Sequence, residues 1–150
     1  MRLDMLITAD LGLIKAYKVI RDELTGNCHA QLIDDQILEM GRKRLKDIDT
    51  DKQGEFAVVS YPLTGERSVG ERHNEKLEIR RKLICEIAKI INQLIKKYNP
   101  MAWALSASSD ILPRILERVD QTAKKNLVKT IPADLTKIDK AEILERFDIK

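Results

Sequence analysis

The chain contains few of the residues on which several classes of protein depend. Among its 150 residues there are two cysteines, two histidines and 4% aromatic residues. Two cysteines provide no disulfide framework, and we expect Cys85, which lies within an apolar helical pattern, to be a small buried thiol in a reducing compartment. The low aromatic content argues against the stacking platforms with which many proteins bind single-stranded nucleic acids.

Long apolar runs are absent as well. No run approaches the roughly 20 residues that cross a bilayer, and the first residues lack the cationic stretch and apolar core of a signal peptide. The sequence therefore predicts a cytoplasmic protein without a membrane span. With 43% hydrophobic and 34% charged residues, the chain is expected to fold as one globular domain, residues 1–150.

A strong charge of one sign is also missing. The formal net charge is +3, which is too small to support a strong nucleic-acid claim by itself. The clear basic excess lies in residues 71–100, which carry eight basic and four acidic side chains. Attraction for a polyanion would have to come mainly from this segment.

The segment from His73 to Ala107 predicts a long amphipathic helix that leads directly into a buried strand. Apolar residues recur at spacings of three and four, so they share one helical face, and charged residues occupy the opposite face. The apolar positions are Leu77, Leu83, Ile84, Ile87, Ala88, Ile91, Leu94, Ile95 and Tyr98. No glycine or proline interrupts residues 73–98, and Pro100 stops the helix. The apolar run at residues 101–107 is typical of a strand covered on both faces.

Shorter patterns before this segment predict early strands. Residues 3–9 and 13–20 flank an Asp-Leu-Gly turn and predict a hairpin. Residues 30–33 are a weaker strand, which Gln36 to Met40 either extend or follow as a short helix. Residues 55–61 predict a third early strand, while the charged stretch at 41–53 and residues 63–72 are expected to be loops.

The remaining elements follow the central segment. We expect a helix at residues 111–119 with a proline in its first turn, and then a short helical turn at 120–126 that begins on an aspartate cap. Residues 127–131 predict the last strand. Thr136 and Asp139 resemble a capping box for a terminal helix.

This order predicts an α/β fold with a mixed sheet of about five strands. The early strands are joined by a hairpin and are therefore antiparallel. The later strands are joined by helices, beginning with the long central one, and must be parallel to their neighbours. Helices are expected on the faces of the sheet.

Short motifs spread over almost the whole chain resemble those of a known family. They are Ile7–Asp10, Lys15–Tyr17, Asp51–Gly54, Trp103–Ser106, Leu112–Val119, Thr122–Val128 and Pro132–Thr136. On these residues the chain resembles the bacterial host attachment proteins, described as required for attachment to host cells. The order of its elements also resembles the ribonuclease-H-like arrangement, seen in translation-machinery components such as the middle domain of the eukaryotic release factor.

The resemblance implies a fold and, through the fold's relatives, an RNA- or ribosome-facing role. Relatives of the release factor use a Gly-Gly-Gln tripeptide, and this chain has no adjacent glycines. We therefore do not expect peptide release. Residues 28–50 show little of the family's pattern, so a function carried by that region stays open.

Metal chemistry has little support in the sequence. In nucleases of this fold an acidic residue on the first strand helps to hold divalent ions, and Asp10 ends that strand here. Asp4 lies about 20 Å away by strand rise and cannot share an ion with Asp10. Asp10 is foremost a turn former and only a weak metal candidate. Cys28 and His29 would point to opposite faces of a strand, and no third ligand is spaced to help them.

Ser106, Ser108, Ser109 and Asp110 lie where the buried strand ends and a helix begins. Open α/β sheets bind ligands at the carboxyl ends of their strands, and a helix N-terminus offers N–H groups to an anion. The corner is therefore a candidate anion or ligand site, with a capped helix packed through small residues as the alternative. A nucleophilic serine is not expected, because both histidines precede the corner and lie in loop-like sequence.

Basic residues form the last candidate site. They are Arg42, Lys43, Arg44 and Lys46 in the charged stretch, and Arg81 and Lys82, with Arg80 and Lys89 nearby, on the long helix. Such runs are usually solvated surface, and the alternative is a patch that faces RNA or the ribosome.

The leading hypothesis is a cytoplasmic, non-enzymatic binding module without a catalytic residue or cofactor. Its partner would be RNA, a ribosomal component or another protein. The alternative hypothesis is a degenerate metal-dependent nuclease of ribonuclease-H-like fold. The third hypothesis is a surface adhesin, which the lack of an export signal disfavours. The sequence gives no oligomeric state.

Overall fold

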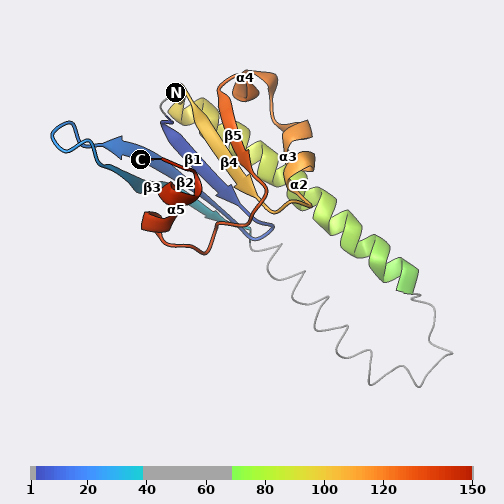
Figure 1. Ribbon diagram of the computed structural model, residues 1–150. Helices are drawn as coiled ribbons and strands as arrows, with labels where there is room; N and C mark the ends of the chain where they lie inside the picture. The colour runs from blue at the N-terminus through green and yellow to red at the C-terminus, as the bar shows by residue number, and fades with distance from the viewer. Residues whose placement is uncertain (1–2, 39–68, 150) are drawn as a thin grey trace.

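The computed structural model describes residues 3–38 and 69–149, with the side chains of the second stretch described from Asn74 onward. Within these residues the chain forms one five-stranded sheet and four helices (Figure 1). The strands are β1 (Met5–Ala9), β2 (Leu13–Arg21), β3 (Cys28–Ile37), β4 (Trp103–Ala107) and β5 (Leu127–Ile131). The helices are α2 (Val69–Tyr98), α3 (Leu112–Arg118), α4 (Gln121–Lys124) and α5 (Lys140–Arg146). The predicted α/β class and the mixed sheet are confirmed.

The strand order in the sheet is β3-β2-β1-β4-β5. The hairpin-linked strands β1, β2 and β3 pair antiparallel, whereas β4 is parallel to both β1 and β5. In chain order α2 precedes β4, and α3 and α4 lie between β4 and β5, as the sequence predicts, because a parallel neighbour can be reached only by a crossover. The parallel strands therefore end at the same edge of the sheet.

Both faces of the central strands are covered. All the residues of β1 and β4 are buried, and alternate side chains enter two different clusters. Met5, Ile7 and Leu105 pack beneath α2 and α3, while Leu6 and Ala104 face α5 on the other side. This division follows from the two-residue period of a strand.

Helix α2 begins earlier than predicted. It starts at Val69, so residues 69–72, which were expected to be loop, are helical. It ends at Tyr98, where Asn99 takes a left-handed φ of 44° and its N–H bonds the Ile95 carbonyl at 2.8 Å. This ending agrees with the predicted stop at Pro100. At about 1.5 Å per residue, the helix is about 45 Å long, and its amino-terminal part extends past the sheet (Figure 1).

Two members of the predicted apolar face of α2 are not in the core. Leu77 is 43% exposed and Tyr98 is 36% exposed. Leu77 lies two residues before Ile79, which is the first buried side chain of the helix that the structure describes. Tyr98 lies at the other end, where its hydroxyl donates to the Ile33 carbonyl of β3 at 3.3 Å. The periodicity predicted which side of α2 is apolar, but it did not predict how much of the helix length packs against the sheet.

The early part of the chain differs from prediction in its third strand. The weak strand at residues 30–33 is the centre of β3, a ten-residue strand that continues through Gln36 to Ile37. The alternative of a short helix beginning at Gln36 is therefore wrong. The strand predicted at residues 55–61, the loop at 41–53 and the loop residues 63–68 lie outside the described residues.

The side-chain caps predicted for the later helices are also wrong. Pro113 does lie in the first turn of α3, but neither α3 nor α4 has a capping side chain, although Asp120 takes the N-cap position of α4. Helix α5 begins at Lys140 after Asp139, so Thr136 lies too far upstream to cap it. No described helix is long and apolar enough to cross a membrane.

Trp103 provides a test of this packing. Its indole is fully buried, and its Nε1–H donates to the Ala123 carbonyl at 2.7 Å, which joins β4 to α4. Trp103→Phe removes the donor, leaves the Ala123 carbonyl with only backbone N–H partners such as that of Asn126 at 3.3 Å, and opens a void. We expect it to lower the free energy of unfolding by about 2 kcal/mol.

Urea unfolding followed by circular dichroism measures this effect, because the substitution removes the single tryptophan. Tyr98→Phe is the matched control, since it removes a donor from an aromatic side chain at the surface. We expect the control to change stability by at most about 0.5 kcal/mol. Equal effects of the two substitutions would contradict the anchoring role of Trp103.

Candidate functional site

Polar side chains gather at the edge of the sheet where the parallel strands end. Asp10 follows β1 directly and forms the predicted turn, because its Oδ1 accepts the Gly12 N–H at 2.7 Å. The other carboxylate oxygen, Oδ2, lies 3.0 Å from the Thr136 hydroxyl. Asp10 thus joins the β1–β2 turn to the segment that follows β5.

Thr136 is fully buried and lies between two carboxylates. Its hydroxyl oxygen is 2.6 Å from Asp134 Oδ1 and 3.0 Å from Asp10 Oδ2, and its N–H donates to the same Asp134 oxygen at 3.0 Å. A hydroxyl has one hydrogen, so it can donate to only one of the two carboxylates at a time. Thr136 therefore fixes the β5–α5 connection to the strand ends instead of starting α5.

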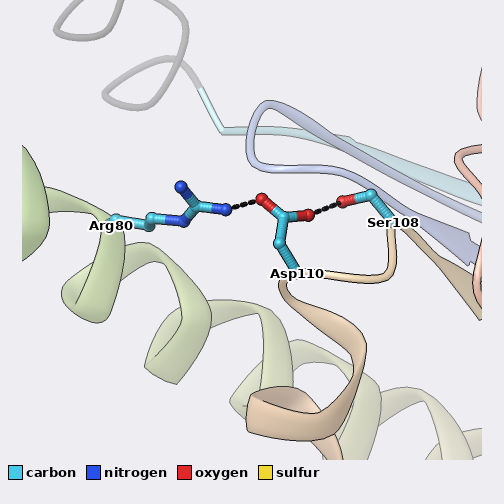
Figure 2. Close-up of polar contacts among 3 residues, drawn as sticks. All are labelled: Arg80, Ser108 and Asp110. Carbon is cyan, nitrogen blue, oxygen red and sulfur yellow. Dashed lines mark hydrogen bonds and ion pairs between the residues drawn. The ribbon is translucent and has the colours of Figure 1, made fainter.

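The four residues of the predicted corner do not act together. Ser106 is fully buried on β4, and its hydroxyl donates to the Ala133 carbonyl. Ser108 donates instead to Asp110 Oδ1 at 2.7 Å, and the second oxygen of Asp110 pairs with Arg80 of α2 (Figure 2). Ser109 is exposed. The corner as an anion site stays a prediction, but Ser106 contacts a different partner from Ser108 and Asp110.

The Arg80–Asp110–Ser108 chain ties α2 to the loop that starts α3 (Figure 2). The Ser108 carbonyl also accepts the N–H groups of Ile111 and Leu112 at 3.1 and 2.9 Å. These backbone bonds take the place of the predicted side-chain cap. The loop is held from both sides, which fixes the position of α3 against α2.

One buried hydroxyl in this part of the molecule has no partner. Thr8 is fully buried on β1, is paired in register with Ser106 of β4, and its Oγ1 makes no hydrogen bond. Lys15 of β2 is the register partner on its other side. Within the described residues, no group of three or more His, Cys, Asp or Glu side chains is arranged to hold a metal ion. Asp10 therefore remains only a weak metal candidate.

Cys28 and His29 lie within β3, so His29 is not in a loop as the sequence suggested. His73 lies within α2. Cys85 is only partly buried and lines a hollow of about 500 Å³ between α2 and β3, together with Lys82, Lys89 and others. The prediction of a fully buried Cys85 is therefore wrong, because the thiol lies at the border of the apolar face.

Two ionisable groups near the sheet have shifted pKa values. Burial, and then the nearby Asp35 carboxylate, raise the pKa of the Tyr17 phenol. In the β2–β3 turn the Leu24 N–H and then the Thr25 hydroxyl bond Asp22 and lower its pKa, although this carboxylate is exposed. The Tyr17 shift is thus explained by burial and a neighbouring charge, and the Asp22 shift by hydrogen bonds within a turn.

The predicted basic patch is only partly within the described residues. Arg42, Lys43, Arg44 and Lys46 lie outside them. Arg81 and Lys82 are both exposed on α2, and Arg81 donates to Glu78 at 2.8 Å. Arg81 also lines a cavity of about 230 Å³ between α2 and α3, with Ile84 and three charged residues of α3.

Those three α3 residues, Arg114, Glu117 and Arg118, were missed in the sequence. The signal was present, because Arg114 and Arg118 are four residues apart and must lie on one helical face. The sequence alone does not show that this face of α3 lies beside Arg81, because β4 separates α2 from α3 along the chain.

Thr136 gives a direct test of the strand-end contacts. Thr136→Val keeps the shape of the side chain and removes the hydroxyl that lies between two carboxylates. We expect it to lower the free energy of unfolding by about 1–3 kcal/mol, because a part-buried contact with two carboxylates loses its donor. Thr130→Val is the matched control, since Thr130 is exposed on β5. Equal stability of the two variants in urea would count against the role of Thr136.

The comparisons with known proteins agree with the resemblance seen in the sequence motifs. No curated protein and no solved structure matches the chain significantly. The family model described as "Protein required for attachment to host cells" matches residues 6–147, which include every strand and helix core described above. The chain therefore belongs to the host attachment protein family.

Proposed function

We propose that the protein is a non-enzymatic binding module that takes the phosphate backbone of RNA on the outer face of α2 and the adjoining α3. The module is one domain and acts in the cytoplasm. The family description reports a phenotype, attachment to host cells, and says nothing of a ligand. The proposal therefore rests on the surface of this chain.

The observation that carries the proposal is the row of exposed cations along α2. The helix buries one side from Ile79 to Ile95, and its other side exposes Arg81, Lys82, Lys89, Lys96 and Lys97. From Arg81 to Lys97 this row covers about 24 Å at 1.5 Å per residue. Over residues 74–98 there are seven basic and three acidic side chains. Cations spread over this length of helix can contact several phosphates.

Contact with the backbone is favoured over reading of the bases. Among the described residues, Tyr98 is the exposed large aromatic side chain, at 36%, and Lys97 lies over its ring. Proteins that bind single strands usually stack bases on several aromatic rings. The surface therefore suits a double-helical RNA, such as a stem of tRNA or ribosomal RNA, recognised through its phosphates.

The proposal includes a ribonuclease-H-like fold, related to the release-factor middle domain. Three antiparallel strands followed by two parallel ones, in the order β3-β2-β1-β4-β5, support it. The relation is one of architecture only. A chain without adjacent glycines lacks the tripeptide with which release factors act.

RNA binding across a salt series tests the proposal. We expect an RNA stem-loop to bind at low salt with an affinity that falls steeply as salt rises. If about five phosphates are neutralised, the slope of log K against log salt is about −4. Lys82→Gln with Lys89→Gln should weaken binding and reduce the slope by about 2.

Lys137→Gln with Lys140→Gln is the matched control, because both lysines are exposed on the α5 side of the sheet. It should leave affinity within about twofold if the α2 face is the binding surface. A slope near zero, or equal weakening by the two double variants, would contradict the proposal. A protein partner captured instead through α2 would replace RNA as the ligand.

A metal-dependent nuclease is the second candidate function. The observation in its favour is that the Asp10 and Asp134 carboxylates both reach one hydroxyl where the parallel strands end. Nucleases of this fold place an acidic residue at this position on the first strand. The two carboxylates are engaged by Thr136, and the described residues bring no third ligand to them. We therefore rank this function below RNA binding.

Thermal unfolding with Mg²⁺ or Mn²⁺ separates the two functions. Because a binding module needs no metal at Asp10, we expect both ions to leave the Tm of the wild type unchanged, and likewise that of Asp10→Asn. A bound ion stabilises the folded state in proportion to its occupancy. A rise in Tm for the wild type that Asp10→Asn abolishes would favour the nuclease.

A further inference from the structure

The cavity between α2 and α3 differs from the hollow between α2 and β3 because arginines from two helices line it. It has a volume of about 230 Å³ and is lined by Arg81 and Ile84 from α2 and by Arg114, Glu117 and Arg118 from α3. We call it the arginine groove. Three guanidinium-bearing side chains from two helices meet there around an apolar floor, since Ile84 is buried.

The positive charges of the arginine groove outnumber the carboxylates that lie beside them. Arg81 is paired with Glu78 at 2.8 Å, but in the part of the chain that the structure describes no carboxylate lies within ion-pair distance of Arg114 or Arg118. Glu117 lines the same groove and forms no ion pair with a described residue. Counting the three arginines against Glu78 and Glu117 leaves one positive charge, which matches the single negative charge of a phosphodiester.

The walls of the arginine groove are held at a fixed separation. Leu112 and Ile115 of α3 are buried in the cluster beneath α2. At the start of α3, Asp110 joins Ser108 to Arg80 of α2 (Figure 2). After α3, the Asp120 N–H donates to the Asn92 side chain of α2 at 2.9 Å. Contacts before, along and after α3 therefore fix this helix against α2. The groove is thus preorganised, and a ligand that binds in it does not have to immobilise the two helices.

We infer that the arginine groove is a specific phosphate-binding site, and that it seats one backbone phosphate of the RNA bound along α2. This inference rests on the proposed function and adds a defined point of contact to it. Guanidinium groups suit the role because each presents two parallel donors to phosphate oxygens, whereas an ammonium acts as a point charge. A phosphate held by such forks fixes the register of the RNA on the helix.

The test compares charge with geometry at the two unpaired arginines. Arg114→Lys with Arg118→Lys keeps both charges and removes the forked donors. We expect it to weaken binding of the RNA stem-loop about tenfold with an unchanged salt slope. Arg114→Gln with Arg118→Gln should weaken binding further and reduce the slope by about 2. Lys137→Arg with Lys140→Arg is the matched control, because it exchanges the same two side-chain types at exposed positions on the α5 side of the sheet, and it should leave affinity within about twofold.

A gain of affinity provides a second measurement that misfolding cannot imitate. Glu117→Gln removes the one carboxylate that α3 contributes to the groove, and we expect it to tighten RNA binding about threefold at low salt. All of these substitutions are at exposed positions, so circular dichroism should show unchanged unfolding.

The outcomes separate this inference from the proposed function. If the wild type binds RNA and the Arg114→Lys, Arg118→Lys variant binds equally well, the groove is not a phosphate site, while RNA binding along α2 stands. If the wild type does not bind RNA at low salt, the proposed function is wrong. The inference that the groove binds an RNA backbone phosphate is then wrong as well. A phosphoserine peptide that binds the wild type but not the lysine variant, without RNA binding, would overturn RNA as the occupant.

Discussion

The burial of β1 and β4 on both faces is the constraint on which the rest of the structure depends. Every side chain in these two strands is buried, including the hydroxyls of Thr8 and Ser106. A strand pair of this kind needs apolar cover on each side. The apolar side of α2 supplies one cover, and the β5–α5 connection with α5 supplies the other.

That constraint explains why the polar residues at the strand ends contribute to structure. The β5–α5 connection must be held across the sheet, and it carries few large apolar side chains. Ser106 binds it through the Ala133 carbonyl, and Asp10 binds it through Thr136. In many open α/β proteins the same edge receives a ligand. Here the hydrogen-bonding capacity of the edge is used to attach a segment of the chain itself.

Much of this architecture could be predicted from the sequence, because it depends on local rules. The 3.6-residue period of α2, its end before Pro100 and the strand at 127–131 follow from periodicity and backbone chemistry. Thr136 was assigned to a helix cap because a capping box is recognised by spacing alone, whereas its partners are 2 and 126 residues away. Arg114 and Arg118 were missed for the same reason, since what matters for them is the neighbour that the tertiary fold supplies.

The two sides of the sheet are covered by different elements, and these elements differ in how many polar residues they use for packing. The β5–α5 connection covers the strand ends, and it is held there by hydrogen bonds from Ser106 to Ala133 and between Thr136 and Asp10. On the α2 side, apolar residues cover the sheet, and two polar residues, Arg80 and Asn92, bind the segments before and after α3. The other exposed charged residues that the structure describes on α2 take no part in these two contacts. Three arginines converge on one concave site there, and among the described residues Arg114 and Arg118 form no ion pair, which is the arrangement from which we infer a bound phosphate.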